Sequence, residues 1–115
     1  MKFIIDAITP VKIDYGNGRV YPAIFDMRAL AYVEKAAGTS HLVFAQKLVD
    51  NSYTLDELAA LATAMHRSAG VEVDEDQVLQ ALNFQNYMVV GEQLIKAMIG
   101  HMLEPEDKSP KNKKA

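Results

Sequence analysis

Three histidines are the side chains of this sequence best suited to metal binding or acid–base chemistry, and they lie in three separate segments: His41, His66 and His101. A zinc-binding helix usually repeats histidine after four residues and adds a nearby carboxylate, because the ligands must share one face. The sequence has no such spacing. We therefore predict no metal site and no cofactor, and we expect structural or surface roles for these histidines.

Carboxylates and serines stand where elements begin or end rather than in catalytic sets. The cluster 74–76 precedes a predicted helix, where negative charge is favourable, so a helix cap is the simpler interpretation and a cation or acid–base site is the alternative. Ser40, Ser52 and Ser68 lie at predicted helix ends, outside any nucleophile elbow. We predict no catalytic residue and no enzyme; an active site assembled from scattered polar residues is a further alternative.

The composition is that of a small, mildly acidic chain. It has 115 residues, half of them hydrophobic, a net charge of −3 and no cysteine. The absence of cysteine is typical of a reducing compartment. The first residues lack the features of a signal peptide, and no segment reaches the roughly 18 to 20 apolar residues of a membrane span. We predict a soluble protein of the cytoplasm that binds neither nucleic acid nor membrane.

The length of the chain predicts one domain followed by a tail. A chain of this size builds a single core, which we place in residues 1–104. Residues 105–115 hold four lysines and no large apolar side chain, which predicts a disordered tail. Binding of RNA or anionic lipid by the stretch 108–114 is the alternative function of that tail.

Alternating apolar side chains predict strands in the N-terminal third. Phe3 to Ala7 and Val11 to Tyr15 alternate in this way, with Pro10 between them, so two short strands or one broken strand would fit. Gly16 to Gly18 supplies residues that tolerate a positive φ, and the chain returns over 19–24. We predict a β-hairpin that opens a mainly α (α+β) domain.

Caps and apolar periodicity predict four or five helices after the hairpin. Asp26 and Ser40 are suitable N-caps, and Thr54 and Asp74 each begin a capping box. The third of these helices has one apolar stripe, which predicts that one of its faces is core. The predicted ranges are 26–37, 40–51, 54–68, 74–82 and 84–103.

The last predicted helix is apolar over much more than one stripe and must be covered on more than one side. It is either the central helix of the monomer, wrapped by the first and third helices, or a surface that contacts another subunit or a client helix; both can hold together. Its methionines are typical of adaptable packing. The predicted protein-binding residues are Tyr87, Met88, Val90, Leu94, Ile95, Met98 and Met102.

The order and spacing of element boundaries over residues 11–103 follow the pattern of a known family. The segments concerned are Tyr21 to Phe25, Ala29-Leu30 with Glu34, Gly38-Thr39-Ser40, Thr54 to Leu58, Gly70 to Asp74, Glu75 to Val78 and the long apolar helix. In this pattern the chain resembles the tail assembly chaperones of long-tailed bacteriophages and related gene transfer agents. The separate motifs are general helix-boundary chemistry, so their order carries the resemblance.

This resemblance implies a non-catalytic protein that binds the hydrophobic, helical tape-measure protein and helps to deliver the tail-tube protein during assembly. It also implies a homo-oligomer. In this family a longer product is often made by ribosomal frameshifting, and Lys113-Lys114 could be encoded by a slippery codon pair. The segment Met1 to Pro10 departs from the family pattern and could be an arm exchanged between subunits.

Two other functions are consistent with a small helical chain. The first is a DNA-binding phage regulator, because residues 40–68 form a helix, a turn and a second helix. The second helix has no Arg, Lys, Asn or Gln set in its first turns to read base edges, which weighs against this function. The second is a structural or completion protein of the tail, which would be retained in the particle.

Overall fold

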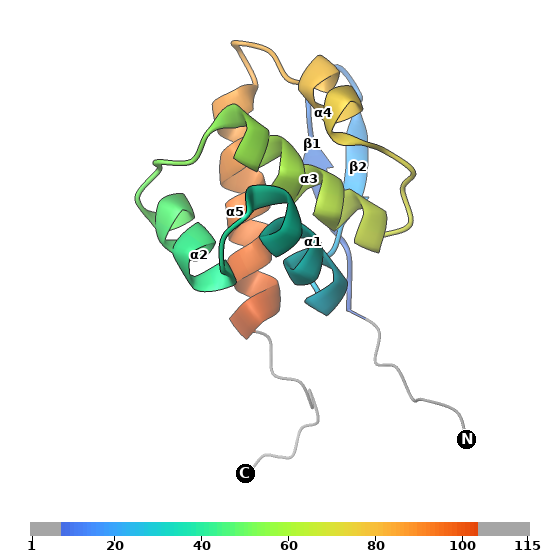
Figure 1. Cartoon of the computed structure of the whole chain (residues 1–115). Coiled ribbons are helices and arrows are strands. Elements are labelled where there is room, and N and C mark those ends of the chain that lie inside the picture. Colours follow the sequence, from blue (N-terminus) through green and yellow to red (C-terminus); the bar gives the residue numbers. More distant parts are fainter. Residues whose placement is uncertain (1–7, 104–115) are drawn as a thin grey trace, which may run out of the picture.

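The computed structural model describes residues 8–103 and begins with a two-stranded antiparallel hairpin (Figure 1). Strand β1 (Val11–Asp14) pairs with β2 (Val20–Ala23). Between them Gly16, Asn17 and Gly18 all have positive φ, as the predicted turn requires. The hairpin is thereby confirmed over these strands, whereas the expected strand over residues 3–7 and the expected tail over 105–115 lie outside the described residues.

The next two helices begin and end close to their predicted limits. Asp26 accepts a hydrogen bond from the Ala29 N–H at the start of α1 (Met27–Ala37), and Ser40 does so from the N–H three residues later at the start of α2 (His41–Val49). Gly38 ends α1 with φ 69°, a conformation that glycine adopts without strain.

Two capping boxes begin the following helices. Thr54 and Glu57 satisfy each other's backbone N–H groups at the start of α3 (Leu55–Ser68). Asp74 makes the same reciprocal pair with the glutamine three residues later, at the start of α4 (Glu75–Ala81). These reciprocal hydrogen bonds are local in sequence, which is why the sequence alone located both helix starts.

The last helix, α5 (Tyr87–Leu103), begins three residues later than predicted. The Asn83 side chain accepts hydrogen bonds from the N–H groups of Gln85 and Asn86, and the Asn86 side-chain oxygen accepts one from the Asn83 N–H. The first N–H groups of a helix have no partner within the helix. Here the side chains of Asn83 and Asn86 bind such N–H groups and hold residues 83–86 in a turn before the helix begins.

The central helix is α3, and α1, α4, α5 and β2 pack around it (Figure 1). All nine residues from Leu58 to His66 are buried, so the prediction of a single core face for this helix was wrong. Four of the nine are alanines, whose small side chains let neighbours approach on every side. The alternative that placed the last helix at the centre was also wrong, since α5 keeps one side exposed.

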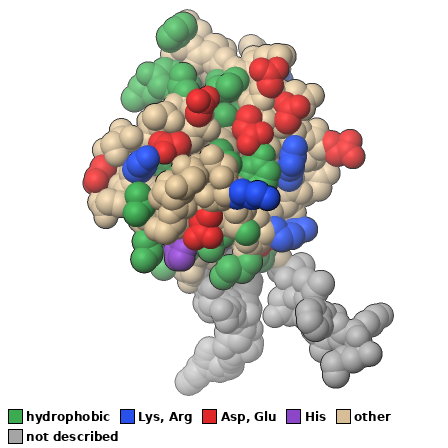
Figure 2. Space-filling view, viewed as in Figure 1, with side chains coloured by type: hydrophobic (Ala, Val, Ile, Leu, Met, Phe, Trp, Pro, Cys, Tyr) green, Lys and Arg blue, Asp and Glu red, His purple; other side chains and the backbone are tan. Residues whose placement is uncertain are grey.

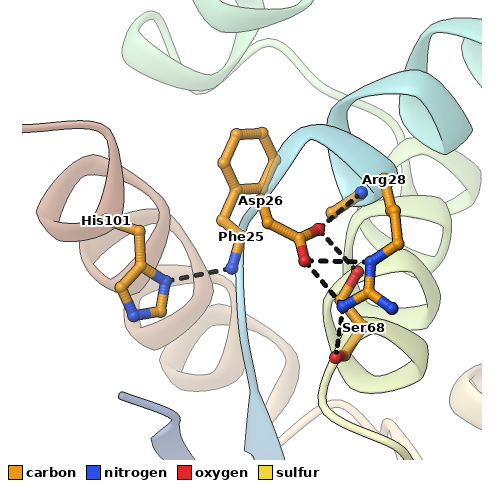
Figure 3. A network of polar contacts seen from close by, with 6 residues as sticks. Phe25, Asp26, Arg28, Ser68 and His101 are labelled. Carbon is orange, nitrogen blue, oxygen red and sulfur yellow. Dashed lines mark hydrogen bonds and ion pairs between the residues drawn. The ribbon is translucent and has the colours of Figure 1, made fainter. Parts of the chain in front are cut away.

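A polar network joins the start of α1 to the end of α3 (Figure 3). The Asp26 carboxylate accepts from Arg28 Nη2 at 2.7 Å and from Ser68 Oγ at 2.9 Å, and Arg28 Nη2 also donates to the Ser68 carbonyl at 3.0 Å. Burial favours a higher pKa for Asp26, but the hydrogen bonds from Arg28, the Ala29 N–H and Ser68 outweigh it and lower the pKa. The carboxylate therefore holds two helices together in its charged form.

Candidate protein-binding surface

Three of the seven predicted contact residues lie inside the folded monomer. Val90 and Leu94 have no exposed surface and Met98 is 5% exposed, because all three face α3 and the hairpin from one side of α5. They contribute to the core of this fold and not to its outer surface. The two roles expected for the last helix, core and surface, thus fall on different sides of the same helix.

The other four predicted contact residues reach the surface. Met88 is 68% exposed and Met102 56%, while Tyr87 is 36% exposed and Ile95 is half-buried. Sequence reasoning missed Ile99, which is 40% exposed and lies on the same side as Met88, Ile95 and Met102. A helical projection of the apolar positions would have found it, because Ile99 follows Ile95 by four residues.

Four apolar side chains line up along the exposed side of α5: Met88, Ile95, Ile99 and Met102, here called the α5 stripe. Their spacing of seven, four and three residues keeps them on one face of a helix. Leu103, which is 76% exposed, extends this apolar surface at the C-terminal end. The helix has about 25 Å of length at 1.5 Å per residue, so the stripe is long enough to accept another helix.

The two edges of the α5 stripe differ. On one edge Glu92 and Lys96 are exposed, and neither makes an ion pair with another of the residues 8–103. On the other edge Gly91 is buried, and a Cβ atom there would lie 2.7 Å from the Tyr53 hydroxyl. The chain between α2 and α3 therefore closes that edge, and only the charged edge is open.

Polar side chains in the turn before α5 and on the side of α5 opposite the stripe hold this helix against the hairpin backbone. The Asn86 Nδ2 donates to the carbonyls of Tyr15 and Ala81, at 2.9 and 3.1 Å. The Gln93 amide accepts from the Asp14 N–H at 2.8 Å and donates to the Asp14 carbonyl at 2.9 Å. The helix is thus fixed in rotation about its own axis, with the α5 stripe turned away from the hairpin.

The third of these contacts comes from His101 (Figure 3). Its Nδ1 accepts from the Phe25 N–H at 3.0 Å, and its Nε2 lies 3.0 Å from the Thr9 carbonyl. A neutral ring with its hydrogen on Nε2 satisfies both groups. This histidine therefore has the structural role that the sequence predicted.

A buried histidine and tyrosine form the polar part of the core. The Tyr15 hydroxyl lies 2.8 Å from Nε2 of His66, whose Nδ1 lies 2.7 Å from the Pro22 carbonyl. Burial lowers the pKa of His66 and raises that of Tyr15 well above its ordinary value. A recess of about 230 Å³ opens beside this pair, with Tyr21 on its wall. Since both His66 nitrogens are occupied, the pair joins β1, β2 and α3 rather than leaving a free base.

A larger shallow recess of about 650 Å³ lies where α3 turns into α4. The Arg67 Nε donates to the Val73 carbonyl at 2.7 Å, and the guanidinium lies 5.4 Å from the centre of the Tyr32 ring. The Tyr32 hydroxyl in turn donates to Glu75, and burial together with that carboxylate raises the pKa of Tyr32 to about 12. Arg67 in this recess, together with Tyr32 and Glu75 beside it, thus joins α1, α3 and α4.

The α5 stripe is thus an exposed apolar surface without a partner among residues 8–103, although Leu42 and Val49 of α2 and Phe84 are also exposed. No protein-family model, curated protein or solved structure matches this sequence or fold. Functional conclusions therefore depend on the geometry of residues 8–103. Within that range no helix is both long and apolar enough to cross a membrane.

Proposed function

We propose that this chain is a non-catalytic tail assembly chaperone, which covers apolar helical segments of a tape-measure protein in the host cytoplasm and assists the assembly of the tail tube. The observation that supports the proposal is the outward α5 stripe, held in place by Asn86, Gln93 and His101 on the other side of the helix. The family resemblance of the element order supplies the identity of the clients.

Burial of the α5 stripe provides a suitable driving force for this activity. Complete burial of one large apolar side chain contributes about 1.5–3 kcal/mol, and two of the four stripe residues are more than half exposed. The loss of translational and rotational freedom offsets several kcal/mol of that gain, so binding should be reversible. Methionine at both ends of the stripe suits clients of varied sequence, because its side chain adapts to different neighbours. Reversible binding to many apolar helices is what a chaperone requires.

The DNA-binding alternative is weakened by the position of α3. A recognition helix must expose one face to the major groove, but residues 58–66 of α3 are buried on all sides. The face shown in Figure 2 carries acidic and basic side chains intermixed rather than a continuous basic surface. A tail completion protein remains the second candidate, and mass spectrometry of purified particles separates it from a chaperone, which should be absent from them.

The experiment that tests the proposal is co-expression with the long helical reading frame beside the gene, followed by pull-down and a solubility assay. Met88→Asp and Met102→Asp should abolish recovery of the client, since each puts a charge into the α5 stripe. Met27→Asp is the matched control, because Met27 is 78% exposed and lies, like Met88, in the first turn of a helix. Met98→Asp is unsuitable, since Met98 is buried and its loss would report unfolding.

The proposal fails if the neighbouring protein is equally insoluble with and without this chain. It also fails if the client is bound as well by the two stripe variants as by Met27→Asp. Circular dichroism and thermal unfolding of all three variants should match the wild type, so that a loss of binding reflects the surface rather than the fold.

A further inference from the structure

We propose that, when no client is bound, the α5 stripe is covered by the same stripe of a second copy, in an antiparallel two-fold pair of α5 helices. The pair brings Glu92 of each copy to Lys96 of the other. The dimer itself follows from the surface of α5 alone; its competition with a client rests on the proposed function.

The spacing of the α5 stripe suits pairing with its own copy. Met88, Ile95 and Met102 are seven residues apart, which is the repeat of two helices that cross at a shallow angle. A two-fold axis beside Ile95 sets Met88 of one copy toward Met102 of the other and each Ile95 against its equivalent. The stripe is therefore complementary to itself, as an isologous interface requires.

The charges on the open edge select the antiparallel arrangement. In an antiparallel pair, the charged edge of one copy lies beside the charged edge of the other. Residue 94 is midway between Glu92 and Lys96, so a two-fold axis near it places Glu92 of one copy next to Lys96 of the other. An axis beside residues 94 and 95 therefore makes two equivalent Glu92–Lys96 contacts. A parallel pair would set this edge against the edge at Gly91, which Tyr53 already closes. Only the antiparallel pair gives both charges a partner of opposite sign.

The size of the surface predicts a weak dimer. Stable interfaces bury about 800 Å² on each partner, and the four partly exposed side chains of one helix offer less than that. Such an interface dissociates readily. A client helix that needs the same stripe could then replace the second copy, so the free protein would keep its apolar surface covered until the client arrives.

Sedimentation velocity over a range of concentrations measures the pairing. The wild type should show a monomer–dimer equilibrium at micromolar concentrations. Glu92→Lys and Lys96→Glu should each weaken it at least tenfold, because each variant sets like charges against each other twice. Mixed in equal amounts, the two variants should form a heterodimer at least as tight as the wild-type pair, since every contact then joins opposite charges.

The mixing experiment isolates the contact between copies. Glu92 and Lys96 are also neighbours four residues apart on their own helix. A change of charge that acts only within one helix is the same whether the two variants are separate or mixed. Only a contact between chains is restored by mixing. The double variant Glu92→Lys/Lys96→Glu should pair with itself, and Met88→Asp should be monomeric while Met27→Asp is not.

Two results would overturn the pairing: a wild type that stays monomeric at several hundred micromolar, or single variants that remain monomeric when mixed. Pull-down of the client with the same proteins separates this from the proposed function. If the dimer is absent but the client is bound, only the pairing is wrong. If the dimer forms but no client is recovered, only the chaperone function is wrong. Glu92→Lys, freed from its partner, should bind the client at least as well as the wild type.

Discussion

The side-chain amide of Gln93 takes both backbone hydrogen bonds of Asp14, accepting from its N–H at 2.8 Å and donating to its carbonyl at 2.9 Å. An amide placed in this way stands where a third strand would pair with β1. A helix side chain thus closes the open edge of a two-stranded sheet, and the same contact turns the α5 stripe outward.

Replacement of Gln93 should loosen the hairpin from α5. Gln93→Ala removes both hydrogen bonds and should cost about 1–2 kcal/mol of unfolding free energy, measured by urea denaturation. Gln93→Glu keeps the acceptor but sets a carboxylate oxygen against the Asp14 carbonyl, so its cost should be at least as large. Hydrogen exchange at the Asp14 amide should accelerate in Gln93→Ala, which loses the acceptor of this N–H. The exposed Gln85→Ala serves as the control, and equal exchange in all variants would contradict the contact.

Acid should destabilise the fold through His66. Burial lowers its pKa in the folded state, opposed in part by the hydrogen bond to Pro22, so protonation favours the unfolded state. This contribution to stability is complete above the ordinary histidine pKa of about 6.5 and falls as the pH drops below it, by up to about 1.4 kcal/mol per pH unit. Urea unfolding between pH 8 and 5 should show a weaker pH dependence for His66→Gln than for the wild type. The exposed His41→Gln should still lose stability below pH 6.5, and parallel curves for His66→Gln and wild type would refute the assignment.

The Asp26 cap should be worth more than the Asp74 cap. Each begins a helix, and loss of a cap typically costs about 1 kcal/mol. Asp26 also binds Arg28 and Ser68, so Asp26→Ala should cost about 2 kcal/mol and Asp74→Ala about 1 kcal/mol in urea unfolding. Equal costs would mean that the link to α3 adds nothing.

Thr63 offers a stabilising substitution. It is fully buried at the middle of α3, and its hydroxyl has no hydrogen-bond partner among residues 8–103. Thr63→Val keeps the shape and removes the buried polar group, so the unfolding free energy should rise by about 1 kcal/mol. Thr63→Ser keeps the hydroxyl and removes a methyl group, so it should lower stability. A Thr63→Val protein less stable than the wild type would show that the hydroxyl does find a partner.

The boundaries of the elements could be read from the sequence because the interactions that set them are local. Asp26, Thr54 and Asp74 each bind an N–H three residues ahead, and the glycines on either side of Asn17 permit the hairpin turn. A local contact also explains why α5 begins three residues later than predicted. The Asn83 side chain caps residues 85 and 86, and the sequence had predicted either a break or a cap at Asn83.

The arrangement of the helices could not be read in the same way. The many large apolar side chains of the last helix were consistent with either a central position or a binding surface, but the alanines of α3 allow closer packing than those large side chains do. The contacts of Asn86, Gln93 and His101 join residues 71 to 92 positions apart in sequence. Such contacts leave no signal in the local sequence. Without them, the sequence does not show how α5 is rotated or which of the predicted contact residues are exposed.

The contact of His101 with Thr9 and Phe25 sets a condition on folding during synthesis. The ribosome makes the hairpin first and the α5 side chains that complete the edge of β1 last, so β1 emerges with the outer hydrogen-bonding groups of Asp14 unpaired. The domain can close only after the final turns of α5 leave the exit tunnel. A nascent chain halted just before Gln93 should therefore expose an open strand edge, and a pause in translation at that point would hold the chain where it is most prone to aggregate.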